Sequence, residues 1–428
     1  MPSLISPTLR DGCPIRVAVL VTLHWTPSAG GHVKVWERFA AAAAQTTDLD
    51  LTIFFLGAED RVVPIHDHAR FHLLPPRLGT DRLPFLDSGA GHTDLASFHP
   101  RLAALLAGFD LLLSTDHFSF GKTARQVARK QGIPIAHSIH TDVETLARTY
   151  GPNILRQALG SRFGGWLADG LNLGDRIAKA EGNKLRAQLA PGAHIFVSRP
   201  EDTALVQASY PGKSTSLLRR GIDLEMFSPD KRDRSWLAER FGRTPDQTVA
   251  VFAGRADGSK RVLVAAQALR ILVDRGHDLT LIIAGSGSDL DNVKALLGDH
   301  VLTPGSLPQA DLARLLASAD LFLFPSESET FGNVALEARA AGLAAVLSAR
   351  PGGTARWIRE DGVDGYGVAG GDPEDWARAL EIALTGDTRA VGRAARRAME
   401  QDAPTWTKVF EEDLMPHWRR LADLQSAP

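Results

Sequence analysis

Residues 249–274 read VAVFAGRADGSKRVLVAAQALRILVD. Five apolar residues come first, a turn begins at Gly254, and apolar residues then recur at helical spacing from Arg261 to Asp274. A short apolar run followed by an amphipathic helix is typical of the strand–loop–helix units that build parallel sheets. The stretch therefore predicts an α/β fold in which a polar loop follows a buried strand.

The same unit recurs along the chain. Apolar runs that predict buried parallel strands lie at 16–23, 49–56, 109–114, 133–139, 194–198 and 216–219, and again at 249–253, 279–284, 320–324, 343–347 and 365–368. Residues 222–248, rich in Asp, Arg, Pro and Ser, separate the two series and predict a linker with one short helix. We expect two Rossmann-like, doubly wound domains facing across a cleft: residues 1–221, completed by a C-terminal helix at 404–428, and residues 222–403.

The composition restricts the class of protein. Of 428 residues, 44% are hydrophobic and 23% charged, which excludes collagen-like, disordered and disulfide-scaffold proteins. The single cysteine fits a reducing compartment, and a net charge of −2 offers no broad basic field for nucleic acid. No apolar run approaches the roughly 18 residues of a membrane span, and no secretory signal pattern is present. We expect a cytoplasmic protein that could still touch the inner face of the membrane, and no cluster of His, Cys and carboxylates predicts a metal site.

The loop after the expected strand 320–324 carries two glutamates. Residues 326–337 read SESETFGNVALE and open a helix near Gly332. The unpaired N–H groups at a helix start favour anionic or hydroxyl-rich ligands, and Glu329 lies in the same loop. Glu337 follows just over one turn into the helix, where its carboxylate can accept two hydrogen bonds from a ribose diol. A solvated loop acid and a surface helix charge are the alternative interpretation of the two glutamates.

The loop after strand 249–253 carries two cations. Residues 254–260 read GRADGSK, again between a strand and a helix. Arg255 offers a planar fork and Lys260 a point charge, so together they can clamp a diphosphate. A solvated basic loop is the alternative.

Polar and flexible residues also follow strands of the first domain. Gly30 and Gly31 precede a helix, where paired glycines let a phosphate approach the backbone, although a simple turn is the alternative. Four side chains at the ends of strands 109–114 and 133–139 would line the site of a polar acceptor: Asp116, His117, His140 and Asp142. A structural role is the alternative for these histidines.

These motifs follow the order of a known family. In sequence they are Gly30-Gly31, His140-Thr141-Asp142, Arg220-Gly221-Ile222-Asp223, Gly254-Arg255 with Lys260, and Glu329-x7-Glu337. From about residue 16 to the last helix the chain resembles the retaining GT-B glycosyltransferases of family 4. The resemblance implies transfer of a sugar from a nucleotide diphosphate sugar with retained anomeric configuration, without a cofactor or a required metal.

The resemblance also implies roles for single residues. Arg255 and Lys260 match the pair that neutralises the leaving diphosphate, Glu329 matches the glutamate that holds sugar hydroxyls, and His140 matches a histidine near the reacting centre. We expect these four residues to be catalytic. In the front-face route proposed for such enzymes, the departing phosphate takes the proton of the acceptor, so no separate base is needed.

Further residues match the donor-binding set of the family. Gly31, beside Gly30, matches the glycine whose amide approaches the diphosphate, and Glu337 matches the ribose-binding glutamate. The remaining donor-binding residues lie beside the diphosphate loop or the sugar: Gly254, Phe331, Gly332 and Asn333. Arg339 departs from the family, which usually has methionine there, but it lies on the packing side of its helix, so we expect no loss of activity.

The acceptor is open. The His140-Thr141-Asp142 and Arg220–Asp223 motifs resemble the branch that contains mannosyl-, sulfoquinovosyl- and other lipid-directed transferases. Residues 156–186 are basic with interleaved aromatic residues, which is typical of a helix on an anionic membrane, or of a solvated helix face over a normal core. A membrane lipid or lipid-linked glycan is the leading hypothesis, and a soluble glycan or small molecule is the next. A GT-B nucleotide-sugar epimerase and a non-catalytic nucleotide-sugar-binding protein are the alternatives from other classes.

Overall fold

The computed structural model describes residues 13–26, 29–80, 92–139, 189–190, 192–244 and 246–426. Its contacts divide the chain into two compact units. Unit 1 comprises Met1–Arg219 together with Trp406–Pro428, and unit 2 comprises Arg220–Thr405. The chain thus leaves unit 1 after residue 219 and returns to it at residue 406, close to the boundaries expected at 221 and 404.

The described part of unit 1 contains an eight-stranded sheet in the order β3-β4-β2-β1-β5-β6-β7-β8. All neighbours are parallel except β3, which is antiparallel to β4. The strands are β1 (Ile15–His24), β2 (Leu49–Leu56), β3 (Arg61–His66), β4 (Ala69–Leu74), β5 (Leu111–Ser114), β6 (Ile135–Ile139), β7 (His194–Val197) and β8 (Ser214–Leu217). The strand order reverses between β1 and β5, so this is a doubly wound sheet.

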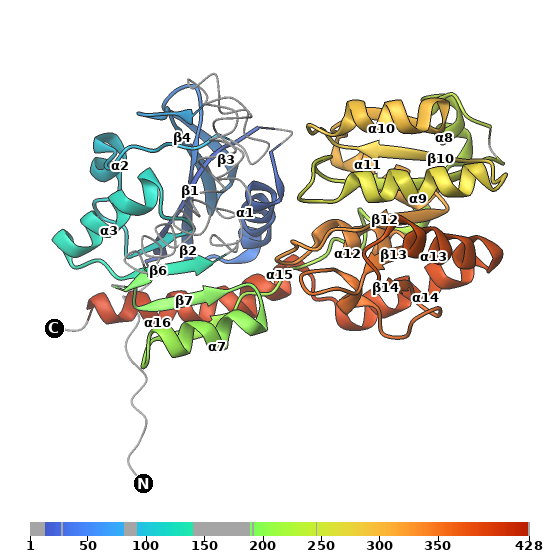
Figure 1. Cartoon of the computed structure of the whole chain (residues 1–428). Coiled ribbons are helices and arrows are strands. Elements are labelled where there is room, and N and C mark those ends of the chain that lie inside the picture. The colour runs from blue at the N-terminus through green and yellow to red at the C-terminus, as the bar shows by residue number, and fades with distance from the viewer. Residues whose placement is uncertain are drawn as a thin grey trace, which may run out of the picture. The chain divides into compact units, whose positions relative to one another are not determined.

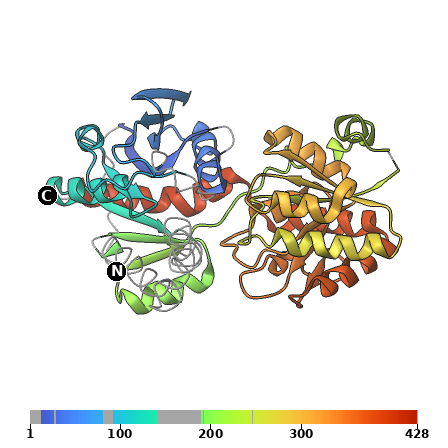
Figure 2. The same ribbon diagram turned by 45° about the horizontal axis from the view of Figure 1, so that its top comes forward.

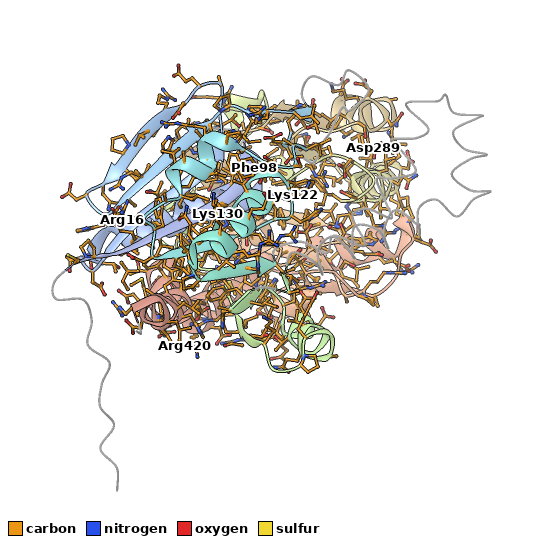
Figure 3. The ribbon with its side chains drawn as sticks, turned by 90° about the vertical axis from the view of Figure 1, so that its left-hand side faces the viewer. Arg16, Phe98, Lys122, Lys130, Asp289 and Arg420 are labelled. Carbon is orange, nitrogen blue, oxygen red and sulfur yellow. The ribbon has the colours of Figure 1, made fainter. Side chains whose placement is uncertain are left out.

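Helices cover both faces of the unit 1 sheet because alternate residues of its strands are apolar on both sides. Val17 and Val19 of β1 pack with α1 (Gly31–Ala42) and the C-terminal segment, whereas Ala18 and Leu20 pack with α2 (Pro100–Leu105) and α3 (Ser119–Gln131). The helix α7 (Pro200–Ser209) follows β7. Figure 3 shows Lys122 and Lys130 on α3, whose Phe120 is buried against the sheet.

The C-terminal segment of unit 1 is helical with an irregular middle. It runs from α15 (Trp406–Val409) through a π-helical turn at Phe410–Leu414 into α16 (Met415–Ser426), and α16 lies along unit 1 in both views (Figure 1, Figure 2). The Met415 N–H donates to the Phe410 carbonyl, five residues back. The widened turn directly precedes Pro416, which cannot donate a helical hydrogen bond. The C-terminal helix expected at 404–428 is thus interrupted by a π turn directly before Pro416.

Unit 2 contains, within the described residues, a six-stranded parallel sheet in the order β11-β10-β9-β12-β13-β14. The strands are β9 (Thr248–Ala253), β10 (Leu279–Ala284), β11 (Val301–Gly305), β12 (Leu321–Phe324), β13 (Ala344–Ser348) and β14 (Tyr366–Val368). The helices are α8 (Arg234–Phe241), α9 (Val262–Asp274), α10 (Leu290–Leu297), α11 (Gln309–Ser318), α12 (Asn333–Ala340), α13 (Pro373–Thr385) and α14 (Thr388–Asp402). Residues 249–252 of β9 are all fully buried, so helices cover this sheet on both faces as well.

The predicted α/β architecture of two Rossmann-like domains is confirmed, with local exceptions. The edge strands β3 and β11 and the neighbouring β4 were not predicted. Pro64 in β3 and Pro304 in β11 weaken a strand pattern, and edge strands are where a sheet accommodates proline. The segment 222–248, which was expected as a linker at the start of the second domain, contributes Ile222, Phe227 and Leu237 to the core of unit 2.

No helix in the described ranges is both long enough and apolar enough to cross a lipid bilayer.

Candidate functional site

The candidate site of unit 2 lies where its strand order reverses. The neighbours β9 and β12 continue into loops 254–261 and 325–332, and the sheet extends from them in opposite directions. In open α/β sheets, ligands bind outside the carboxyl ends of the strands at this reversal point. The loops that the sequence singled out for two cations and a glutamate are therefore the two loops at this point.

Close backbone packing joins the loops that follow β9 and β10. The Ala256 N–H donates to the Ser286 carbonyl at 2.9 Å. A Cβ atom added to Gly285 would lie 1.8 Å from the Gly254 carbonyl oxygen, and one added to Gly287 would lie 2.2 Å from that of Ala256. Close approach of the two loop backbones thus requires glycine at both positions.

Arg255 is held by its own loop. Its Nη2 donates to the Ser259 hydroxyl at 2.8 Å, and its Nη1 lies 3.4 Å from the Asp257 carboxylate. The Arg255 side chain keeps 28% of its surface exposed. A guanidinium that is anchored in its loop and remains partly exposed can still reach a ligand.

Lys260 and Glu329 meet across the two loops. The Lys260 Nζ lies 2.6 Å from Glu329 Oε1, and the Ser326 hydroxyl donates to the same oxygen at 2.7 Å. The Lys260 and Glu329 side chains are only 18% and 13% exposed, and Ser326 is fully buried. The structure thus brings together two predicted site residues that are 69 positions apart in the chain.

Further contacts fix the same two loops to each other. Glu327 pairs with Arg261 and, at 3.2 Å, with Arg350, and the Ser328 hydroxyl donates to the Ser259 carbonyl at 2.8 Å. Among the described residues, Arg261 is the only non-glycine with a positive φ, 55°. Burial and the charge of Arg350 lower the pKa of Arg261. A strained backbone held by an ion pair in this way fixes the shape of the loop.

The helix α12 begins at the second loop. Gly332, directly before Asn333, has φ of 81°, and an added Cβ would lie 2.3 Å from Thr354 Cγ2. Only glycine fits such a position without strain. The first N–H groups of α12 thus follow a glycine that lets the loop turn tightly, next to Glu329.

Arg356 and Trp357 hold the carbonyls of this loop. The Arg356 guanidinium donates to the carbonyls of Thr330 at 3.1 Å, Phe331 at 3.0 Å and Gly353 at 2.8 Å. The Trp357 indole N–H donates to the Phe331 carbonyl at 2.9 Å, and the two rings lie 4.8 Å apart. These contacts give hydrogen-bond donors to the carbonyls of the loop before α12.

Two other predicted residues of unit 2 lie near the loop 325–332. Glu337 is close to it in the sequence, and Arg220 is close to it in space. Glu337 is half-buried, one turn into α12. Arg220 is buried, its guanidinium lies 5.9 Å from the centre of the Phe331 ring, and burial lowers its pKa to about 10. The buried Arg220 guanidinium thus packs near the Phe331 ring.

In unit 1, the glycine pair lies at the reversal point between β1 and β5. Gly30 has φ of −66°, and a Cβ added to Gly30 or Gly31 would meet no atom within 4 Å. Neither packing nor the Gly30 backbone angle therefore demands glycine at these positions. The next residue, His32, lies 3.1 Å from the Thr115 hydroxyl, measured from Nε2.

The structure describes two of the four acceptor-side candidates of unit 1, Asp116 and His117. The Asp116 carboxylate accepts hydrogen bonds from the Thr22 N–H and hydroxyl, at 2.8 and 2.7 Å, and burial raises the pKa of Asp116. His117 is buried and stacks on Phe118, with ring centres 4.6 Å apart. His140 and Asp142, like the basic segment 156–186, lie outside the described residues.

No three His, Cys, Asp or Glu residues in the described ranges lie close enough together to hold a metal ion.

Sequence reasoning missed several residues that shape the site. Ser326 holds Glu329, Ser259 holds Arg255, Thr354 packs on Gly332, and Arg356 holds the loop carbonyls. The hydroxyls of Ser259 and Ser326 lie in the quoted loops, so their position next to charged residues was a usable signal. Thr354 and Arg356 come from the loop after β13, and no local pattern connects them to α12.

Comparisons with known proteins agree with this geometry. A model of the family described as "Glycosyl transferases group 1" matches residues 235–406. The D-inositol 3-phosphate glycosyltransferase of Salinispora arenicola is 31% identical over 417 residues, which cover 90% of this chain and 88% of that protein.

Solved structures share the fold. Sucrose-phosphate synthase from Thermosynechococcus elongatus superimposes with a TM-score of 0.72 at 17% identity, covering 96% of this chain and 100% of that one. Anabaena Alr3699/HepE in complex with UDP-glucose gives a TM-score of 0.62 at 16% identity, covering 96% of this chain and 99% of that one. The fold of this chain is thus that of GT-B glycosyltransferases.

Proposed function

The chain belongs to the group 1 glycosyltransferases, and on that premise we propose that it transfers a sugar from a nucleoside diphosphate sugar to a hydroxyl of a phosphorylated polyol such as D-inositol 3-phosphate. The resemblance expected from the motifs is confirmed at the level of this family, and the enzyme class is glycosyltransferase. Membership in family 4, retention of configuration and the lipid-directed branch stay predictions.

One observation of unit 2 carries the donor assignment. Lys260, from the loop after β9, and Glu329, from the loop after β12, lie 2.6 Å apart at the point where the strand order reverses. Cations bind the diphosphate of the donor, and hydrogen-bond acceptors bind its sugar. Because the diphosphate and the sugar are adjacent in the donor, the residues that bind them must also be adjacent. We assign Arg255 and Lys260 to the diphosphate and Glu329 to sugar hydroxyls.

The remaining donor contacts follow from the same loops. The N–H groups of Gly332 and Asn333 at the start of α12, beside Phe331, are assigned to the sugar, and Glu337 to the ribose. Gly254 lets the diphosphate loop leave β9, with φ of 138°. In unit 1, Gly30 and Gly31 are assigned to the donor because their open surroundings admit close approach to the backbone.

The reaction breaks the bond between the anomeric carbon and the diphosphate oxygen and forms one between that carbon and the acceptor oxygen. Negative charge gathers on the departing phosphate, so Arg255 and Lys260 stabilise the transition state. In the retaining route the acceptor proton moves to the departing phosphate. His140, the predicted residue near the reacting centre, lies outside the described residues.

The assignment of a phosphorylated polyol as acceptor rests on the relatives, and a membrane lipid is the alternative acceptor. The relative from Salinispora arenicola, which covers 90% of this chain, is named for D-inositol 3-phosphate, a small phosphorylated polyol. The basic segment 156–186 favours a membrane lipid and contact with the inner membrane face. We propose the phosphorylated polyol as acceptor, with Asp116, His117, His140 and Asp142 as the acceptor-side candidates.

We propose that transfer needs no metal. Two side-chain cations supply the positive charge that the leaving diphosphate requires. Excess EDTA should therefore leave the initial rate of sugar transfer within about twofold of the untreated rate, as measured by nucleotide release. A loss of activity that Mg²⁺ or Mn²⁺ restores would contradict this.

An acceptor panel tests the proposed function. The protein is incubated with UDP-, GDP- or ADP-sugars, each alone, with D-inositol 3-phosphate, or with a lipid extract, while nucleotide release and product mass are followed. We expect release that depends on D-inositol 3-phosphate, and a glycosylated product whose anomeric configuration NMR reports as that of the donor. Release only with lipid would identify a lipid acceptor, isomerised donor without acceptor would identify an epimerase, and an unchanged donor in every arm would refute transfer.

A further inference from the structure

Lys260 and Glu329 contact each other directly, although the donor needs both. We propose that Glu329 competes with the diphosphate for Lys260: it neutralises the lysine when the site is empty, turns to the sugar when the donor binds, and helps to expel the nucleoside diphosphate after transfer. This inference rests on the proposed function. It assigns Glu329 a role in product release besides its role in holding the sugar.

The geometry of the pair supports competition. The Nζ–Oε1 distance is 2.6 Å, and both side chains are more than four-fifths buried. The Ser326 hydroxyl donates to the same Oε1 at 2.7 Å and so aims the carboxylate at the lysine. A charge-assisted hydrogen bond that is largely shielded from water is strong, and a phosphate must outcompete it.

Charge makes the two partners of Lys260 mutually exclusive. A phosphate oxygen within hydrogen-bond distance of Nζ would lie within a few ångströms of the Glu329 carboxylate, and two like charges in a poorly hydrated site repel each other. Sugar hydroxyls offset this cost because they donate hydrogen bonds to the carboxylate. A nucleoside diphosphate without a sugar offers no such donors, so Glu329 penalises the product more than the substrate.

The surrounding contacts restrict the exchange to a side-chain rotation. The Glu329 N–H donates to the Gly352 carbonyl at 2.9 Å, the Ser328 hydroxyl holds the Ser259 carbonyl, and Glu327 pairs with Arg261. The backbone on which Glu329 stands is therefore fixed on the side of the lysine loop. Only the Glu329 carboxylate has to leave Lys260 when the diphosphate arrives.

Calorimetric titration of the full chain with UDP, and in parallel with GDP and ADP, tests the proposal. Glu329→Gln keeps the size of the side chain but removes its charge. We expect this variant to bind the nucleoside diphosphate roughly tenfold more tightly than the wild type, which is the factor lost to one competing charge-assisted hydrogen bond. Its kcat should fall, and inhibition by the product should become stronger.

Three further variants make the result specific. In a Lys260→Met background, Glu329→Gln should change the dissociation constant by less than about twofold, because the competed cation is gone. Glu381→Gln removes the same charge from unit 2 at the far end of α9, where Glu381 pairs with Arg275, and should leave nucleoside diphosphate binding within about twofold. If the glutamine variant does not fold, Glu329→Ala also removes the charge, and it should likewise bind the nucleoside diphosphate more tightly than the wild type.

The outcomes separate this inference from the proposed function. If none of UDP, GDP and ADP binds the wild type, the proposed function fails. If one binds, but binding to Glu329→Gln is unchanged or weaker, or Glu381→Gln tightens binding equally, the competition is refuted while the proposed function stands.

Discussion

Arg339 is fully buried in unit 2. Its Nη2 donates to Asp364 Oδ2 at 2.6 Å, and Nη1 donates to the Asp364 backbone carbonyl at 2.5 Å. Burial alone would raise the pKa of Asp364, but hydrogen bonds from Arg339 and from the backbone outweigh it and lower that pKa. A departure from the family that looked like a packing detail is thus a buried ion pair, whose loss would leave one charge uncompensated.

Arg255 allows a test of the leaving-group role at the scale of one residue. Arg255→Ala should lower kcat by about 10²–10³, the usual effect of losing one preorganised donor at developing charge. Initial rates at saturating donor measure this. Arg275→Ala is a matched control, because Arg275 lies at the far end of α9 and pairs there with Glu374 and Glu381. A loss of less than about fivefold for Arg255→Ala would remove Arg255 from the leaving-group role.

Elements of unit 1 meet at a pair of histidines. His194 of β7 is fully buried, with Nδ1 and Nε2 each 2.8 Å from a serine hydroxyl of β8, Ser214 and Ser216. Its ring lies 4.2 Å from that of His417 on α16. Burial lowers the pKa of His194 to about 3, and it also lowers the pKa of His417. The contact between the sheet and α16 therefore requires neutral imidazoles.

This pair makes the stability of unit 1 depend on pH. Because the folded-state pKa of His194 is about 3 and the ordinary pKa of histidine is 6.5, only the unfolded chain binds this proton between those values. Stability therefore falls as pH falls from about 6.5, by up to about 1.4 kcal/mol per pH unit for one proton. Urea unfolding at several pH values measures the slope, and His194→Gln should make it shallower. An unchanged slope would show that His194 is not the group responsible.

At the scale of the whole molecule, unit 1 is built from two separate parts of the chain, one before and one after unit 2. Residues 406–428 return after all of unit 2 and supply Phe410, Leu414 and Trp418 to the core of unit 1. Trp418 is fully buried, with its ring centre 5.6 Å from that of Phe410. Unit 1 is therefore incomplete until the last residues of the chain are in place.

Truncation of the Trp418 side chain tests whether the C-terminal segment completes the core of unit 1. Trp418→Ala should reduce the free energy of unfolding of unit 1 by about 3–5 kcal/mol, the usual effect of removing a fully buried tryptophan side chain. Thermal unfolding with and without UDP should show the loss in the transition of unit 1, whereas the affinity of unit 2 for nucleotide should stay unchanged. Leu424→Ala on the same helix is the control, since Leu424 is 62% exposed. Equal effects of the two substitutions would contradict the assignment of α16 to the core.

The sequence by itself determined the strand–loop–helix repeats, and with them two doubly wound sheets. Their apolar periodicity is a local property, and β2 and β10 begin and end at the expected residues. The sequence also placed Arg255, Lys260 and Glu329 in loops that follow strands, because a polar segment after an apolar run can be recognised from the sequence alone. The edge strands escaped prediction because proline and exposed positions weaken their pattern.

Only the tertiary structure decided which of these residues meet. That Glu329 faces Lys260, that Arg339 pairs with Asp364, and that α16 packs on β1 and β5 of unit 1 depends on strand order and helix packing. Such contacts join positions far apart in the chain, and no local pattern of hydrophobicity or charge encodes them. They follow from how two sheets bury both of their faces, which is a property of the folded chain as a whole.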